Sequence, residues 1–264
     1  MTVRIDDPDD PRIAAYRQVR ERDLVGREGR FIAEGEVVLR VLLGSRLCRT
    51  VSILIDEQRL DRLSDLLSAK PDEAPLYVAA QPVIDAIAGF HLHRGILALG
   101  EPRRRPSVTD LLAGLPERAL VTGLFGIGNH DNMGGIFRNA AAFGADAVVL
   151  NSDCCDPSYR KAIRVSVGAS LVTPFAWASE GEDVIGALQA AGFDILALSP
   201  AGQVSLADVK RAPRTAILLG AEGPGLPDKI LNRVTAVRIP MSGGLDSLNV
   251  ATASGIVLHH LADC

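Results

Sequence analysis

Polar residues near the end of the chain have the types and the spacing of a small-molecule binding site. A short apolar strand, expected at 236–241, runs into a glycine-containing loop at 242–244, and a helix is expected to begin near Ser247. The Ser247 hydroxyl is a suitable N-cap because it can accept a hydrogen bond from a backbone amide of the first helical turn. Ser247 and Asn249 would then stand at the start of this helix, beside free loop amides. The pattern predicts a ligand site.

A second candidate site lies at 129–140, where Asn132, two glycines and Arg138 follow one another closely. Considered alone, the stretch could be a helix capped by Asn132, with Arg138 in solvent. However, each glycine in the first turn of such a helix lowers its stability by about 1 kcal/mol. The stretch therefore suits the close approach of a ligand or of another chain segment better than it suits a stable isolated helix.

A third candidate follows the strand expected at 215–219, where Glu222 stands in the glycine-rich loop 220–226. Considered alone, the loop could be a simple strand-to-helix turn with Glu222 in solvent. No hydrophobic core requires an acidic residue at this point, and loops that follow strands often carry functional residues. Glu222 is therefore also a candidate for a role at a site.

The composition is that of an ordinary globular protein, with 47% hydrophobic and 23% charged residues. The formal net charge of −4 does not favour nucleic-acid binding by the chain as a whole. An aromatic content of 4% argues against a surface that stacks bases on aromatic rings. Any contact with a nucleic acid must therefore come from local groups of basic residues.

Three such basic groups occur in the sequence. They comprise Arg17, Arg20, Arg22, Arg27 and Arg30, then Arg103, Arg104 and Arg105, and finally Arg160, Lys161 and Arg164. The first group can equally be a solvated face, because acidic residues are interleaved with it. The functional alternative is contact with phosphates along an RNA, where each cation releases a counterion.

Several protein classes are not expected. The acidic start of the chain lacks the apolar segment of a signal peptide, and no run approaches the roughly 18 apolar residues of a membrane span. Four cysteines are too few and too irregular for a disulfide framework or a zinc site. His91 and His93 have no acidic or cysteine neighbour in sequence, so no metal is expected there. We expect a cytosolic protein without membrane contact.

Strands and helices alternate through the first hundred residues. Strands are expected at 30–33, 51–55, 76–79 and 95–99, and helices at 11–23, 37–42, 56–67 and 82–88. The alternation predicts a small α/β layer structure. Two prolines enclose three arginines at 102–106, which is typical of a stiff exposed linker. We therefore predict domains at 1–101 and 107–264.

The second predicted domain alternates in the same way. Strands are expected at 119–124, 147–150, 171–175, 194–198, 215–219 and 236–239, and helices at 133–143, 159–167, 183–191, 228–234 and 247–261. Most of these strands are continuous apolar runs, as in a parallel sheet that is covered on both faces. Ligands of such sheets lie at the carboxyl ends of the strands, where the loops carry the chemistry.

The three candidate stretches, in this order, resemble the three motifs of the SpoU/TrmH family of RNA 2′-O-methyltransferases in the SPOUT superfamily. Asn129–Ala140 resembles the first motif, Leu218–Leu226 the second, and Ser247-Leu248-Asn249 with its small-residue helix the third. The resemblance covers the C-terminal half of the chain. One departure is that Asn129-His130 stands where the family usually has Asp-Pro.

The resemblance implies site residues. It implies catalytic-site positions at Asn132, Arg138, Glu222, Ser247 and Asn249, with Glu222 holding its loop. It also implies that S-adenosylmethionine is the cofactor. The cofactor would lie against the backbone of Gly220, Ile239 and Leu248, with Met241 as part of the wall.

The resemblance also implies an architecture. The C-terminal parallel-sheet domain would contain a deep trefoil knot, a rare exception to ordinary chain topology, and would form a homodimer. A smaller α/β domain of ribosomal-protein type would precede it and bind the RNA substrate. Phe31–Leu43 resembles this domain, and His93-Arg94-Gly95 resembles its closing His-Gln-Gly, with Arg in place of Gln.

The activity implied is S-adenosylmethionine-dependent methylation of a ribose 2′-hydroxyl in RNA. The N-terminal substrate domain favours ribosomal RNA over transfer RNA, and an RNA-binding assembly factor without activity is the alternative of a different class. Asn132, Ser247, Asn249 and Arg138 offer no side chain that titrates near neutral pH, so the general base stays open. We expect Arg138 to bind the target phosphate and to lower the pKa of the hydroxyl electrostatically.

Overall fold

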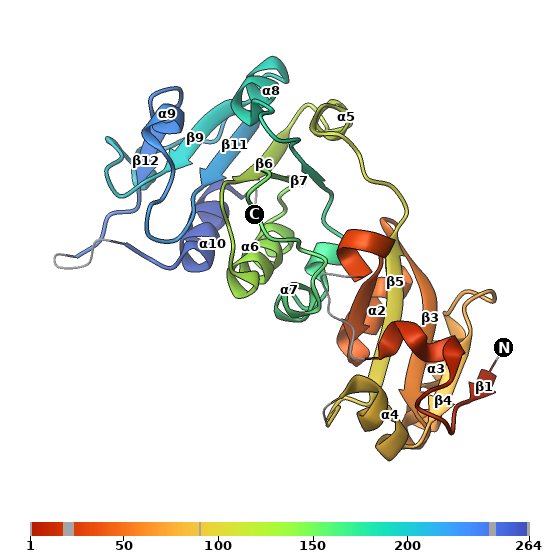
Figure 1. Cartoon of the computed structure of the whole chain (residues 1–264). Helices are drawn as coiled ribbons and strands as arrows, with labels where there is room; N and C mark the ends of the chain where they lie inside the picture. Colours follow the sequence, from red (N-terminus) through yellow and green to blue (C-terminus); the bar gives the residue numbers. More distant parts are fainter. Residues whose placement is uncertain (1, 18–23, 90, 243–246, 263–264) are drawn as a thin grey trace. The chain divides into compact units, whose positions relative to one another are not determined.

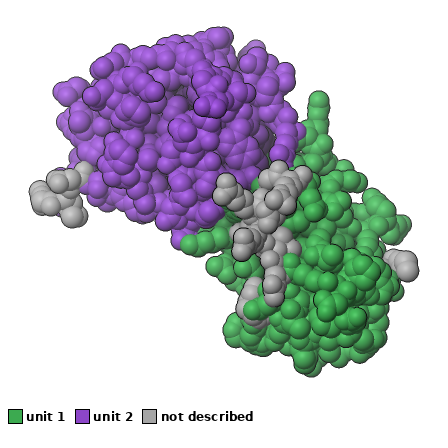
Figure 2. Space-filling model, in the orientation of Figure 1, with its two compact units in different colours: residues 1–104, 158–172 green, residues 105–157, 173–264 purple. Residues whose placement is uncertain are grey.

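The protein is described from a computed structural model, which places residues 2–17, 24–89, 91–242 and 247–262 (Figure 1). The chain forms two compact units (Figure 2). The first comprises Met1–Arg104 with Ser158–Val172, and the second comprises Arg105–Pro157 with Thr173–Cys264. The first division falls inside the predicted linker, whereas Ser158–Val172 groups with the first unit from within the predicted second domain.

A five-stranded mixed sheet is the centre of the first unit. Its strand order is β1 (Thr2–Arg4), β4 (Leu76–Ala79), β3 (Cys48–Asp56), β5 (Ile96–Pro102) and β2 (Phe31–Glu34). Strand β4 pairs in parallel with β1 and β3, while β5 is antiparallel to β3 and β2. Along β3, Ile53 and Ile55 join one core cluster and Leu54 joins another, because successive strand residues point to opposite faces.

Helices contribute to both core clusters of this sheet. One cluster contains residues of α2 (Glu36–Gly44), η4 (Asp61–Leu63), α3 (Ser64–Ser68), α7 (Arg160–Val165) and η5 (Ala169–Leu171). The other contains residues of η1 (Pro11–Tyr16) and α4 (Gln81–Ala88). The π-helix η2 (Leu24–Glu28) and the 3₁₀ turn η3 (Glu57–Arg59) complete the first unit.

Segment Ser158–Val172 is part of the hydrophobic core of the first unit. Ile163 and Leu171 are fully buried in the cluster that contains α2. The Ser45 hydroxyl donates a hydrogen bond of 2.6 Å to the Leu171 carbonyl. The strand predicted at 171–175 is therefore wrong: residues 169–171 form η5 against the first unit, and strand β8 begins only at Phe175.

Two other predicted elements differ in the structure. The helix expected at 11–23 is a 3₁₀ helix at Pro11–Tyr16, started by the Asp10 side chain, which accepts from the Arg12 amide at 2.8 Å. Residues 18–23 lie outside the described part of the chain. The helix expected at 56–67 is divided into η3, η4 and α3, because i→i+3 hydrogen bonds replace the α-helical pattern up to residue 63.

The second unit contains a seven-stranded sheet. Its order is β10 (Val204–Ser205), β12 (Thr235–Arg238), β9 (Asp194–Leu198), β11 (Arg214–Leu219), β6 (Ala119–Leu124), β7 (Ala147–Leu150) and β8 (Phe175–Trp177). Every neighbouring pair is parallel. All residues of β6 and β7 are buried, as their continuous apolar runs predict. The predicted α/β parallel sheet is confirmed.

Helices cover both faces of the seven-stranded sheet. Residues of α5 (Val108–Ala113), α8 (Val184–Ala190) and α9 (Asp228–Leu231) share one core cluster with the strands. On the other face, α6 (His130–Ala142) packs against α10 (Val250–Leu261) (Figure 1). The 3₁₀ turn η6 (Leu206–Asp208) follows β10. None of the helices in the described ranges has the length and apolar character needed to cross a membrane.

Close contact between α6 and α10 brings two of the predicted motifs together. A Cβ atom at Gly135 would lie 2.7 Å from the Cβ of Ala251, so only glycine permits this approach. Four residues along α6, the Asn139 amide donates to the Ala251 carbonyl at 2.7 Å and to the Ser254 hydroxyl at 2.9 Å. Of the two glycines noted in the sequence, Gly135 thus serves the approach of another chain segment.

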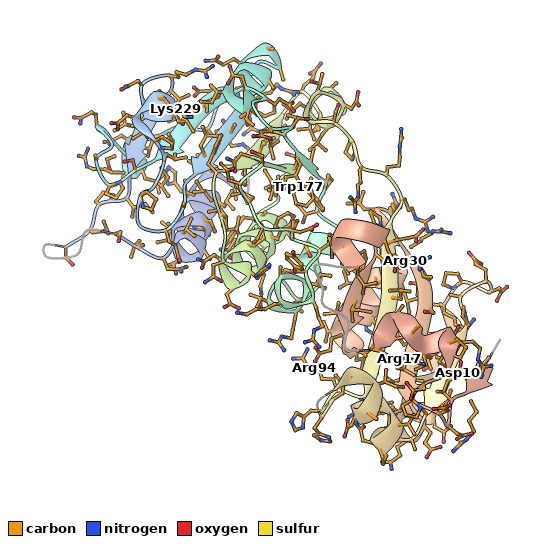
Figure 3. All side chains as sticks on the ribbon, in the orientation of Figure 1. Asp10, Arg17, Arg30, Arg94, Trp177 and Lys229 are labelled. Atoms are coloured by element: carbon orange, nitrogen blue, oxygen red, sulfur yellow. The ribbon has the colours of Figure 1, made fainter. Side chains whose placement is uncertain are left out.

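Replacing Gly135 by valine is expected to destabilise the second unit by about 1–3 kcal/mol, because the added atoms overpack the α6–α10 contact. Ala141→Val is the matched control, since Ala141 is exposed on the same helix and loses only about 0.7 kcal/mol or less of helix propensity. Urea unfolding followed by the fluorescence of Trp177, the single tryptophan (Figure 3), would measure both. Equal midpoints for the two variants would contradict the close-contact interpretation.

Candidate active site

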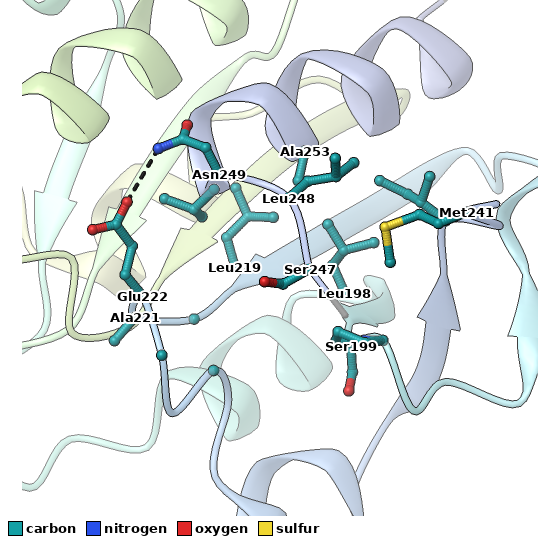
Figure 4. A pocket seen from close by; sticks show the side chains of 16 residues that line it. Leu198, Ser199, Leu219, Ala221, Glu222, Met241, Ser247, Leu248, Asn249 and Ala253 are labelled. Carbon is teal, nitrogen blue, oxygen red and sulfur yellow. Dashed lines mark hydrogen bonds between the residues drawn. The ribbon is translucent and has the colours of Figure 1, made fainter. Parts of the chain in front are cut away.

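A cavity of about 350 Å³ opens at the carboxyl ends of β9, β11 and β12 in the second unit (Figure 4). This is the expected place for a ligand in a parallel sheet, and the volume is in the range of small-molecule sites. Its walls include the predicted residues Gly220, Glu222, Ile239, Met241, Ser247, Leu248 and Asn249. Seven of the nine predicted site residues therefore line one cavity.

The loop that follows β11 is a tight turn closed on itself. The Gly225 amide donates to the Ala221 carbonyl at 3.0 Å, and Gly225 has a φ of 67°, which favours glycine. Gly220 faces the backbone of Gly225 and Leu226 so closely that any Cβ would overlap it. Because Gly220 has no side chain, the loop that lines the cavity can close on itself.

Three motif side chains form one hydrogen-bonded network at the edge of the cavity. The Asn132 amide donates to Glu222 Oε1 at 2.5 Å. The Asn249 amide donates to the same oxygen at 3.1 Å, as the dashed line in Figure 4 marks. The Asn249 amide also donates to Asn132 Oδ1 at 2.8 Å. Residues from three distant stretches of sequence thus meet, as the predicted site requires.

Asn249 has a second role, as the N-cap of α10. Its Oδ1 accepts hydrogen bonds from the Ala251 and Thr252 amides at 2.9 and 3.2 Å. The prediction that Ser247 caps this helix is therefore wrong, because α10 begins at Val250 and its free amides are satisfied by Asn249. Ser247 instead lines the cavity ahead of the helix.

The cap of α6 also differs from the simple interpretation of its sequence. Asn129 is the N-cap, and its Oδ1 accepts from the Asp131 amide at 2.8 Å. Asn132 lies inside the first turn, 5% exposed, and its side chain is directed to Glu222 and Asn249 instead of the helix backbone. The helix thus begins earlier than the predicted 133.

Arg138 does not join the network. It follows Asn132 by six residues, which rotates it by about 120° around the helix from Asn132. Its side chain is exposed and makes no hydrogen bond or ion pair with the described residues. Asn139, one position further and two turns from Asn132, faces α10 instead. The predicted catalytic arginine is therefore available to a partner from solution.

The residues of the cavity wall that sequence reasoning missed include Leu198, Ser199 and Pro200. They follow β9, so the position of ligands after parallel strands was the signal that could have found them. Sequence reasoning also missed Asn139, whose role depends on the packing of α10. A polar residue seven positions from Asn132 on the same helical face was the available sign.

The adjacent cysteines are poor candidates for catalysis. Burial raises the pKa of Cys154 and raises the pKa of Cys155 to about 12, so both are thiols at neutral pH. Within the described ranges, no group of three His, Cys, Asp or Glu residues could hold a metal ion.

Comparison with known proteins identifies the family. A sequence model of the SpoU rRNA Methylase family matches residues 119–259, slightly more than half of the chain. The chain belongs to this family. It is 40% identical over 264 residues to an uncharacterized tRNA/rRNA methyltransferase of Mycobacterium bovis, covering 96% of this chain and 89% of that protein. The family resemblance inferred from the three motifs is confirmed, and the protein is an RNA methyltransferase of the SpoU family.

Other proteins similar to this chain are also RNA methyltransferases. The chain is 30% identical to the 23S rRNA (guanosine-2′-O-)-methyltransferase RlmB of Photobacterium profundum, over 83% of this chain and 92% of that protein. A solved RNA 2′-O ribose methyltransferase superposes with a TM-score of 0.76 at 28% identity, covering 98% of both chains. An AdoMet-bound rRNA methyltransferase from Sinorhizobium meliloti has the same fold, with a TM-score of 0.83 at 24% identity over 98% and 97% of the two chains.

The two roles of Asn249 can be separated by mutation. Asn249→Ala removes the helix cap and should lower the stability of the second unit by about 1 kcal/mol. Asn249→Ser retains a capping oxygen but loses the amide that contacts Glu222, so it should be the more stable of the two variants. Urea unfolding followed by Trp177 fluorescence would compare them. Equal stability would show that the cap contributes little.

Proposed function

We propose that this SpoU-family protein is a cytosolic enzyme that transfers a methyl group from S-adenosylmethionine to a ribose 2′-hydroxyl in RNA, and that ribosomal RNA is its substrate. The observation that carries the proposal is the network of Asn132, Glu222 and Asn249 at the edge of the cavity. The names of the RlmB relative and of the solved 2′-O ribose methyltransferase support the ribose hydroxyl as target.

The cavity fits S-adenosylmethionine. Apolar side chains of Leu198, Met241 and Leu248 offer a surface for an adenine ring, and loops on either side offer backbone groups to its polar edge. A Cβ atom at Gly220 would overlap the backbone of Gly225 and Leu226, so glycine at this position keeps the loop beside the cavity closed on itself. When bound, the cofactor supplies a methyl group on a positively charged sulfur, which is already an activated leaving group. Gly220, Ile239, Met241 and Leu248 would hold it.

The residues of the chain then have to orient the ribose and assist removal of its proton. Asn132 and Asn249 are fixed by their mutual hydrogen bond and by the α10 cap, so they present a rigid edge to the nucleotide. Arg138 would bind a phosphate of the RNA, since its guanidinium is exposed and makes no hydrogen bond or ion pair with any residue in the described ranges. Its positive charge would lower the pKa of the nearby hydroxyl.

The first unit would bind the RNA substrate. Arg94 (Figure 3), Arg104 and Arg164 are exposed and have no hydrogen bond or ion pair with the part of the chain that the structure describes, so they are available to phosphates. In the first basic group, by contrast, Arg17 pairs with Asp9 at 3.1 Å, as a solvated, internally balanced face would. Arg20 and Arg22 lie outside the described residues.

Two architectural features stay part of the proposal. A homodimer through the second unit is supported by an apolar groove over α6 and α10, lined in part by Phe143 and by Ile256, which is 39% exposed. A trefoil knot at the C-terminal segment is carried over from the family resemblance. Light scattering on the purified protein would test the dimer.

Methyl incorporation is the experiment that tests the function. Labelled S-adenosylmethionine would be offered with unmodified ribosomal RNA and, separately, with transfer RNA, and the 2′-O-methylated nucleotide would be mapped. We expect label in ribosomal RNA. Label in transfer RNA alone would correct the substrate. Cofactor binding without label would indicate that a ribosomal particle is required, whereas neither binding nor label would favour a non-catalytic RNA-binding factor.

Gly220→Ala should weaken cofactor binding by more than about tenfold, or 1.4 kcal/mol, because the methyl group overlaps the backbone of the same loop. Gly128→Ala is the control, since a Cβ at Gly128 meets no atom within 4 Å. Calorimetric titration with S-adenosylmethionine would measure both. Unchanged affinity in Gly220→Ala would place the cofactor elsewhere.

Arg138→Lys should lower kcat/KM for RNA by about tenfold or more, because lysine cannot form the two parallel hydrogen bonds that a guanidinium makes to a phosphate. Cofactor affinity should stay unchanged, since Arg138 does not line the cavity. A rate near that of the unmodified enzyme at neutral pH would exclude bidentate phosphate binding by this residue.

A further inference from the structure

We propose that Glu222 is the proton acceptor of the reaction, and that its Oε2 atom takes the proton of the ribose 2′-hydroxyl. The inference rests on the proposed ribose methylation. It gives Glu222 a chemical role in place of, or in addition to, the loop-holding role that the family resemblance implies.

The two oxygens of the Glu222 carboxylate have different surroundings. Oε1 accepts hydrogen bonds from the Asn132 and Asn249 side-chain amides, at 2.5 and 3.1 Å. Oε2 receives no hydrogen bond from any described residue, and the side chain is exposed at the edge of the cavity. Among the described residues that line the cavity, Glu222 is also the single one with an ionisable side chain. Oε1 is therefore fixed by hydrogen bonds, whereas Oε2 is available to a substrate.

The hydrogen bonds also fix the direction of the carboxylate. Asn249 Oδ1 must accept from the Ala251 and Thr252 amides, so its nitrogen has to face Asn132 and Glu222. Asn132 Oδ1 accepts from that nitrogen, so the nitrogen of Asn132 also has to face Glu222. A carboxylate oxygen has enough lone-pair positions to accept two donors. The network thus positions an acceptor instead of only closing a loop.

The chemistry is suited to a carboxylate. As the ribose oxygen forms its bond to the methyl carbon, the carbon–sulfur bond breaks, and its electron pair stays on the sulfur. The hydroxyl becomes strongly acidic as the oxygen–carbon bond forms, so a weak base is sufficient when the proton leaves late in this step. The proton passes to Glu222 Oε2, and the resulting carboxylic acid releases it to solvent, to which Glu222 is exposed.

The arginine of the first motif is poorly suited to this role. A guanidinium has donors but no acceptor, and it does not deprotonate in proteins. Arg138 is exposed and makes no hydrogen bond or ion pair with Asn132, Glu222 or Asn249, which agrees with phosphate binding instead. Arg138 then binds the phosphate, and Glu222 accepts the proton.

Glu222→Gln separates proton acceptance from loop support. The glutamine carbonyl can still accept both asparagine amides, but the second position becomes an NH₂ group that cannot take a proton. We expect unchanged folding and S-adenosylmethionine affinity, with a single-turnover methylation rate at least about 100-fold lower. Glu180→Gln, at an exposed position of the same unit, is the matched control and should keep the full rate.

A second variant covers the case in which Glu222→Gln binds cofactor poorly. Glu222→Ala, saturated with cofactor, should be inactive in buffer and regain methylation when formate is added, because formate can occupy the vacated space and take the proton. Formate should not accelerate the unmodified enzyme.

The results separate the role of Glu222 from the proposed ribose methylation. A Glu222→Gln rate within about threefold of the unmodified enzyme, or a Glu222→Ala rate that formate does not raise, overturns the proton-acceptor role and leaves ribose methylation standing. If the unmodified enzyme methylates no RNA at the 2′ position, the proposed function fails, and the role of Glu222 fails with it.

Discussion

The site depends on the side chain of Asn249, which takes part in two structures at once. Its oxygen caps α10, and its nitrogen contacts Asn132 and Glu222. Because the cap fixes which end of the amide points outward, the start of the helix and the orientation of the network are set by one residue. The Gly135–Ala251 approach and the Asn139 hydrogen bonds then hold α10 against α6, which carries Asn132.

The parallel sheet explains why the cavity lies next to this network. All seven strands point the same way, so the loops after β9, β11 and β12 gather at one edge. The loop after β11 supplies both the bare backbone of Gly220 and the carboxylate of Glu222, which places the wall of the cavity and the charged group two residues apart. One loop thus contributes both to the wall of the cavity and to the network of Asn132, Glu222 and Asn249.

The first unit is built partly from sequence that lies between two strands of the second unit. Ser158–Val172 leaves the second sheet after β7, contributes Ile163 and Leu171 to the first core, and returns before β8. Removal of this segment would leave the Ser45 hydroxyl without the Leu171 carbonyl and would open the cluster around α2. The chain therefore passes between the two units at three points, 104–105, 157–158 and 172–173.

The sequence by itself determined the residue types of the site, the order of the three motifs and the parallel α/β character, because apolar runs and glycine loops are local signals. It could not decide between Ser247 and Asn249 as the cap, since both can accept from the same amides and only the path of the chain into α10 selects one. It could not reveal that Asn132 meets Glu222 while Arg138 does not, because that depends on which face of α6 the second helix covers. Nor could the sequence assign Leu171 to the core of the first unit. A short apolar run is compatible both with a strand of the second sheet and with a turn that packs into the core of the first unit.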